Sequence, residues 1–117
     1  MIRRYGDCAR DQKTEMRGGS GTIRFEHFLD GSKDEYYGKG RLFSKIIIDP
    51  GCSIGYHVHE GEMESFYVVR GRPFYNDNGT VFELAPGDVT LTRDGEGHGV
   101  ENRGGEPVEL VALILYK

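Results

Sequence analysis

Apolar and polar residues alternate with a period of two in short segments along most of the chain. Residues 22–28 carry this pattern, which is typical of a half-buried β-strand. Further strand-like runs cover residues 42–48, 65–70, 72–75, 80–84, 89–92 and 108–116. Strands about every eight to twelve residues predict a β-sandwich or small barrel. Since no longer segment shows a helical period, we expect an all-β fold.

Turn residues separate these runs. Residues 76–79 read Asn-Asp-Asn-Gly, and Asn and Gly tolerate the positive φ angles of tight hairpins. The first 21 residues are polar and end in a glycine-rich segment, which predicts an arm with a flexible joint. The sequence therefore divides into an N-terminal arm, residues 1–21, and one barrel domain, residues 22–117.

Composition and charge narrow the classes of function. The 117 residues include 18 glycines and carry a formal net charge of −4, so a broad basic surface for nucleic acid is not expected. No apolar run approaches the roughly 20 residues that a membrane-spanning helix needs. The two cysteines, Cys8 and Cys52, form neither a C-x-x-C pair nor a disulfide framework, and no signal-peptide core follows the start. We therefore expect two free thiols and a cytoplasmic protein without nucleic-acid or membrane partners.

Three of the four histidines fall in two compact clusters. His57 and His59 are two residues apart, so on a strand their side chains point to the same face. Glu60, Glu62 and Glu64 follow within one turn, and His98 comes after a glycine-rich segment further on. Three imidazoles and one carboxylate inside a barrel would suit Fe, Mn, Co, Ni, Cu or Zn. His27 lies on the first alternating strand and is expected to be a satisfied or surface histidine.

The spacing of these residues resembles the cupin family. The first cupin motif, G-x5-H-x-H-x(3 or 4)-E-x6-G, is matched at every fixed position, and the second, G-x5-P-x-G-x2-H-x3-N, is matched except for its proline. The matching residues are Gly51, His57, His59, Glu64 and Gly71 in the first motif, and Gly87, Gly95, His98 and Asn102 in the second. Arg93 stands in place of the proline, a change that affects a turn and not a ligand.

The resemblance implies a jelly-roll barrel, also called a double-stranded β-helix, with one divalent transition metal. The ligands it implies are His57, His59, Glu64 and His98, with Glu64 chosen over its neighbours by the family spacing. Strand parity places Phe66 on the face of Glu64 and Val100 on that of His98, so both are candidates to line a substrate pocket. Asn102 is expected to hold its own turn.

Two functional hypotheses follow from the resemblance. The first is a metal-dependent enzyme acting on a small oxygenated substrate, as a sugar or sugar-phosphate isomerase, a dioxygenase or a decarboxylase. The second is a non-catalytic binding or sensor protein for a sugar or small acid. No motif separates these chemistries, and no catalytic residue is assigned.

Charge and association complete the expectations. Five basic residues are candidates for an anion contact at the barrel mouth, namely Arg41, Lys45, Arg70, Arg72 and Arg93. The closing segment 108–115 is apolar at nearly every position, so it should be buried on both faces or paired at an edge. Together with the family resemblance, this predicts a homodimer, with the arm of residues 1–21 as a candidate to cross to the partner.

Overall fold

The computed structural model describes all 117 residues and consists of ten β-strands with three short 3-10 turns. The strands are β1 (Ala9–Thr14), β2 (Thr22–His27), β3 (Gly40–Ile48), β4 (Ser53–Val58), β5 (Glu62–Arg70), β6 (Phe74–Asp77), β7 (Thr80–Glu83), β8 (Val89–Thr92), β9 (Gly97–Glu101) and β10 (Val108–Tyr116). The 3-10 turns are η1 (Tyr5–Asp7), η2 (Met16–Gly18) and η3 (Gly31–Lys33). The predicted all-β class is confirmed.

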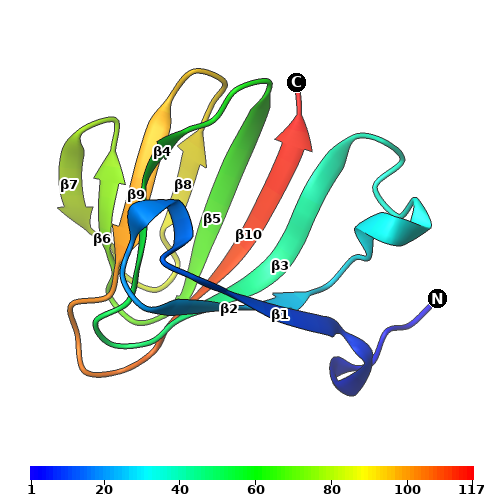
Figure 1. Cartoon of the computed structure of the whole chain (residues 1–117), viewed down its shortest axis with the longest axis horizontal. Coiled ribbons are helices and arrows are strands. Elements are labelled where there is room, and N and C mark those ends of the chain that lie inside the picture. The colour runs from blue at the N-terminus through cyan, green and yellow to red at the C-terminus, as the bar shows by residue number, and fades with distance from the viewer.

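The strands form two antiparallel sheets that face each other (Figure 1). The larger sheet has the order β1-β2-β3-β10-β5-β8, and the smaller has the order β4-β9-β6-β7. Consecutive strands repeatedly change sheet, as in a jelly roll, so the predicted barrel is also confirmed.

The apolar core lies between the sheets because alternate residues of both point inward. Its members include Ile23, Ile46 and Leu110 from the larger sheet and Ile54 and Val100 from the smaller one. β10 shows the alternation most clearly, with four inward residues buried and the residues between them half-buried. This packing fixes the inner face on which the histidines lie.

The turns follow the sequence signals. β6 and β7 are joined by a tight hairpin in which Asn78 and Gly79 have φ angles of 51° and 100°. Asn102 donates to the carbonyl oxygens of Ile48 and Glu106 and accepts from the Gly104 amide. It therefore holds its own turn, as predicted, and also ties that turn to β3.

The first 21 residues contain structure that the pattern did not reveal. Residues 9–14 form β1, which pairs antiparallel with β2 over its full length. All six side chains of β1 are exposed, so no buried face imposes an apolar period of two on its sequence. Residues 15–21 connect β1 to β2, and we call this connection the hairpin tip. A contact of the N-terminal segment with a second copy stays a prediction.

The closing strand β10 does not lie at an edge. It pairs with β3 on one side and with β5 on the other, so the chain itself satisfies its backbone groups. The apolar sequence of this strand therefore gives no separate support for a homodimer, which stays a prediction. None of the helical segments has the length and apolar character that crossing a bilayer requires.

Candidate metal centre and cavity

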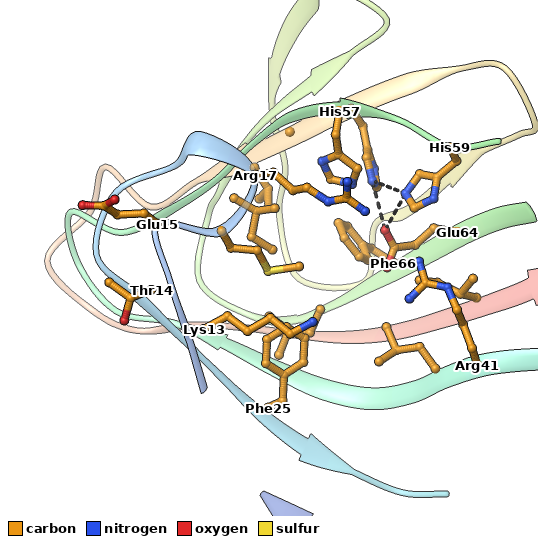
Figure 2. A pocket seen from close by; sticks show the side chains of 18 residues that line it. Lys13, Thr14, Glu15, Arg17, Phe25, Arg41, His57, His59, Glu64 and Phe66 are labelled. Carbon is orange, nitrogen blue, oxygen red and sulfur yellow. Dashed lines mark hydrogen bonds and ion pairs between the residues drawn. The ribbon is translucent and has the colours of Figure 1, made fainter. Parts of the chain in front are cut away.

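A cavity of about 430 Å³ opens between the two sheets, and the hairpin tip borders it (Figure 2). Four polar residues lie together on its inner wall, and we call them the floor: His57, His59, Glu64 and His98. Three cationic residues border it further out, and we call them the mouth: Lys13, Arg17 and Arg41. Apolar residues, among them Phe66 and Val100, line much of the rest.

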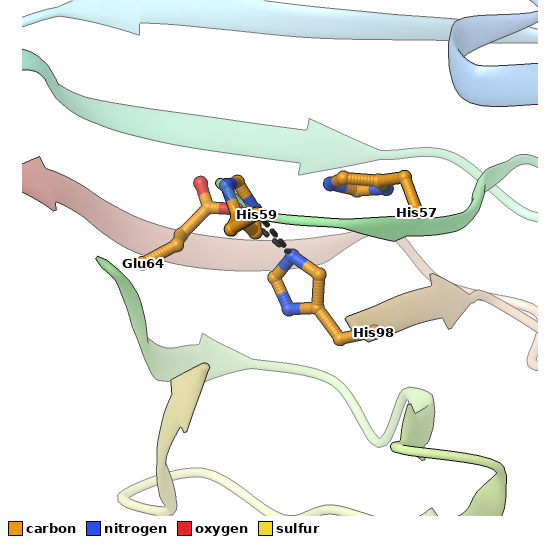
Figure 3. Close-up of side chains that lie close together, drawn as sticks. All are labelled: His57, His59, Glu64 and His98. Carbon is orange, nitrogen blue, oxygen red and sulfur yellow. Dashed lines mark hydrogen bonds and ion pairs between the residues drawn. The ribbon is translucent and has the colours of Figure 1, made fainter. Parts of the chain in front are cut away.

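Three strands position the floor, two of them in the smaller sheet and one in the larger. β4 carries His57, and His59 follows directly after its end. His98 lies on β9 in register with His57, while Glu64 comes from β5 in the facing sheet. The four side chains therefore converge from both sheets, as Figure 3 shows.

The ligand atoms of the floor are close together. One donor atom from each of the four residues lies within 4.8 Å of the others. The Nε2 atoms of His59 and His98 are 3.0 Å apart, and the Glu64 Oε1 atom is 3.0 Å from each. His59, Glu64 and His98 are 2%, 5% and 1% exposed, whereas His57 is half-buried at the cavity side.

Hydrogen bonds from outside the floor orient two of the imidazoles. The Nδ1 atom of His57 donates to the Gly55 carbonyl oxygen at 2.8 Å, and that of His59 donates to Glu62 at 2.8 Å. A carbonyl or carboxylate oxygen only accepts, so Nδ1 holds the proton in both neutral rings. In these neutral rings the Nε2 atoms present lone pairs to the shared centre, as in metal-ligating histidines, whereas protonated His59 also donates from Nε2 to Glu64.

His98 is held by two hydroxyl groups and by stacking. Its Nδ1 atom lies 2.8 Å from the Tyr75 hydroxyl and 3.0 Å from the Thr92 hydroxyl, and these two are themselves 2.9 Å apart. The ring of Phe66 stacks on the imidazole with 5.2 Å between centroids. Packing and hydrogen bonds together leave His98 one orientation, with Nε2 directed at Glu64.

The pKa shifts follow from this crowding. Burial raises the pKa of Glu64, but hydrogen bonds to His59 and His98 outweigh it and bring the pKa below its usual value. The same bond to Glu64 raises the pKa of His59. Burial lowers the pKa of His57, with a further contribution from positive charges nearby, including that of Arg17. The floor therefore combines a charged carboxylate with a histidine that favours the unprotonated state.

The floor fits a divalent transition metal. Electron-pair donors 3.0 Å apart repel one another unless a cation, either a proton or a metal, lies among them. Bonds of about 2.1 Å from a metal to imidazole nitrogen place neighbouring ligand atoms about 3 Å apart, which agrees with this spacing. Three imidazoles with one carboxylate suit Fe, Mn, Co, Ni, Cu or Zn.

The three mouth cations differ in their partners. Arg41 makes a paired contact with the Glu62 carboxylate, at 2.7 Å and 2.8 Å. The Lys13 ammonium lies 5.3 Å from the centroid of the Phe25 ring. Arg17 makes no hydrogen bond or ion pair with its side chain, and its guanidinium extends from the hairpin tip toward His57 (Figure 2).

Some of the predicted site residues meet at the cavity, and others lie outside it. The four predicted ligands meet at the floor, and Phe66 and Val100 line the cavity, whereas Glu60 is exposed outside it. Of the five basic candidates for the mouth, only Arg41 borders the cavity. Lys45 pairs with Glu26 and Glu109, Arg70 with Glu106, and Arg93 with Glu96. Cys8 and Cys52 are free thiols outside the floor.

Several residues at the site carried no signal in the sequence. Lys13 and Arg17 lie in the segment that the pattern assigned to an arm, and no periodicity directs either side chain to a cavity. Tyr75 and Thr92 act on His98 through contacts that only the folded sheets create, whereas Glu62, a candidate ligand in the sequence, instead contacts His59 from outside the floor.

Comparisons with known proteins agree with this geometry. The family described as "Cupin domain" matches residues 44–114. An oxalate-binding protein from Thermotoga maritima is 37% identical over 115 residues, which cover 98% of this chain and 93% of that protein.

Solved structures extend the likeness to the whole chain. The crystal structure of a predicted oxalate decarboxylase from Thermotoga maritima superposes with a TM-score of 0.92 at 36% identity, covering 100% of both chains. A polyketide cyclase from Streptomyces resistomycificus has a TM-score of 0.77 at 18% identity, covering 99% of this chain and 80% of its own. The second likeness concerns the fold alone.

Proposed function

Because the chain belongs to the cupin domain family, we propose that it binds a small dicarboxylate in a metal-dependent manner, with oxalate as the first ligand to test. One observation carries the proposal: a cluster of three histidines and one glutamate lies in a cavity bordered by three cationic side chains. The cluster accounts for a metal, and the cations account for an anionic ligand.

The metal would be held by His57, His59, Glu64 and His98. Four protein ligands leave coordination positions open on metals that accept five or six, and when bound the metal supplies a Lewis-acid position for a carboxylate oxygen. Glu62 and Tyr75 hold the rings of His59 and His98 in place from outside. The apolar wall around Phe66 and Val100 limits access of water to this position.

The charge of the cavity supports an anionic ligand. The chain as a whole has a formal charge of −4, yet Lys13, Arg17 and Arg41 are gathered at one opening. Arginine binds carboxylates through paired N–H donors, so such a mouth favours small organic acids over neutral sugars. The similarity to an oxalate-binding protein from Thermotoga maritima agrees with this charge.

Binding is better supported than turnover. Decarboxylation of oxalate to formate and carbon dioxide moves a proton and so requires an acid–base group at the ligand. Glu15 points away from the floor (Figure 2), and Glu62 is committed to Arg41 and His59. Decarboxylase, isomerase and dioxygenase activities, the cytoplasmic location and the homodimer stay predictions.

The test compares Glu64→Ala with Glu60→Ala, an exposed glutamate four residues away. Elemental analysis of tag-free protein should find about one transition-metal ion per chain in wild type and in the Glu60 variant, and almost none in Glu64→Ala. Calorimetry should then detect oxalate binding only to the two metal-loaded proteins. Two results would contradict the proposal: absence of metal after loading, or equal oxalate affinity of the protein with and without metal. A formate assay on the same samples separates binding from decarboxylation.

A further inference from the structure

We propose that Arg17, carried by the hairpin tip, binds the ligand carboxylate that the metal leaves free and so selects dicarboxylates over monocarboxylates. This inference rests on the proposed function and adds the residue that determines its specificity. Three observations support it: the conformation of the hairpin tip, the contact of the tip with β4, and the lack of a hydrogen bond or ion pair at the Arg17 guanidinium.

The conformation of the tip directs Arg17 inward. Glu15 and Arg17 both adopt left-handed backbone angles, with φ of 52° and 54°. The amides of Gly18 and Gly19 donate to the carbonyl oxygens of Glu15 and Met16 at 3.0 Å and 2.9 Å, which closes a tight turn. The Glu15 side chain consequently points away from the floor, while that of Arg17 extends toward His57 (Figure 2). A left-handed angle is uncommon for residues other than glycine, so two in three residues indicate a tip held in a defined shape.

Contact with β4 fixes the tip over the cavity. The Ser53 amide donates to the Ser20 carbonyl oxygen and the Ser20 amide to the Ser53 hydroxyl, both at 2.9 Å. A Cβ atom at Gly55 would clash with the carbonyl oxygen of Arg17, and one at Gly19 would clash with that of Ser53. The two backbones approach this closely only because both positions are glycine. The position of Arg17 therefore depends on a residue of the opposite sheet.

Of the three mouth cations, Arg17 is the one whose side chain contacts neither a carboxylate nor an aromatic ring. The Glu62 carboxylate already neutralises Arg41, and Lys13 lies over an aromatic ring. Arg17 has no such partner, although its guanidinium lies on the side of the cavity where His57 faces the mouth. A dicarboxylate with one group on the metal presents its second group to this guanidinium, whereas acetate has no second group. Only the dicarboxylate gains the charged hydrogen bonds.

The experiment measures ligand affinity and metal content separately. Wild type, Arg17→Gln, Lys13→Gln and Arg4→Gln are loaded with Co²⁺ and titrated with oxalate and with acetate by calorimetry. Arg4 is an exposed arginine outside the cavity and matches the change in net charge. Arg17→Gln should weaken oxalate binding about tenfold or more, because a hydrogen bond between charged groups is lost, and should leave acetate affinity and cobalt content unchanged. Arg4→Gln, the control, should lose less than about threefold, and Lys13→Gln should lose less than Arg17→Gln because the Lys13 ammonium lies over the Phe25 ring.

A second variant moves Arg17 without changing it. Gly55→Ala should displace the tip from β4 and reduce oxalate affinity by a similar factor, and the double variant with Arg17→Gln should lose little more than either alone. Gly105→Ala, where a Cβ atom meets nothing within 4 Å, is the matched glycine control.

The outcomes separate the two proposals. If wild type binds oxalate and Arg17→Gln binds it equally well, or if Lys13→Gln loses as much as Arg17→Gln, the role of Arg17 is refuted and the proposed function stands. If cobalt-loaded wild type binds no oxalate, the proposed function fails and this inference fails with it.

Discussion

The floor and the mouth of the cavity hold their charged groups in different ways. At the floor, His59, Glu64 and His98 are almost fully buried, and every imidazole has an outer hydrogen-bond partner. At the mouth, Lys13 and Arg17 are exposed and lack an anionic partner. The polar groups of the floor find their hydrogen-bond partners within the chain, whereas two charges of the mouth have no anionic partner there.

From this difference we expect metal affinity and ligand affinity to depend on separate parts of the molecule. Buried hydrogen bonds fix the floor before any ligand arrives, because an unsatisfied polar group there would be costly. Lys13 and Arg17 of the mouth lie on the exposed β1–β2 hairpin. Changes at the floor should therefore affect both metal and ligand, and changes at Lys13 or Arg17 should affect the ligand alone.

Glu62 joins the two regions, so replacing it should have the largest effect of the remaining tests. It accepts a hydrogen bond from His59 and pairs with Arg41, and these contacts hold its pKa at about 2, with Arg41 the larger cause. Glu62→Gln keeps the shape but removes the charge that supports His59, and metal affinity should fall about ten- to a hundredfold. Competition with a chelator measures this, and the exposed Glu60→Gln is the control. Equal affinity in both variants would mean that the orientation of His59 does not depend on Glu62.

The two regions should also differ in their response to pH. Since the hydrogen bond to Glu64 raises the pKa of His59, this ring keeps a proton above its ordinary pKa of about 6.5. A metal must displace that proton before it can bind His59. Below the raised pKa, metal affinity should therefore fall about tenfold for each pH unit and each proton displaced, and above that pKa it should be constant.

Oxalate affinity of the metal-loaded protein should not follow this slope, because guanidinium groups do not lose their proton in this range of pH. Titrations between about pH 6 and pH 8 measure both affinities. Parallel slopes for metal and oxalate would remove the distinction between floor and mouth.

His27 sharpens the comparison with the smallest effect. Its Nδ1 atom lies 2.6 Å from the Ser44 hydroxyl and its Nε2 atom 3.2 Å from Asp11, so neither nitrogen is free for a metal. His27→Gln should leave metal content unchanged and lower the free energy of unfolding by about 1 kcal/mol, the usual contribution of a hydrogen bond. Urea denaturation and elemental analysis on the same sample check both parts. A loss of metal would show that the floor depends on more than its own partners.

Much of the barrel could be predicted because its strands carry a buried face. The runs at 22–28, 42–48 and 108–116 correspond to β2, β3 and β10, and the Asn78-Gly79 signal marks the β6–β7 hairpin. Strand parity predicted that His57 and His59 share a face, and the resemblance to the cupin motifs predicted that Glu64 and His98 join them, as they do in the structure.

The rest depends on contacts between segments far apart in the sequence. β1 has no buried face, so no period of two could reveal it. Arg17 reaches the cavity only because two glycines, 19 and 55, allow the hairpin tip to approach β4. Tyr75 and Thr92 meet His98 only after β6, β8 and β9 have assembled into their sheets. Such placement is a property of the folded chain rather than of any local pattern.

The β1–β2 hairpin has a consequence for how this barrel can change. All six residues of β1 are exposed, and the tip places only Met16 against the core, so β1 and the tip add little to the interior, whereas β2 supplies Ile23 and Phe25. A different loop between residues 14 and 22 would bring a different side chain over the cavity while the four floor residues stayed in place. Under the proposed function, loop exchange at this one position should therefore change which small acid is bound while the four floor residues keep their arrangement.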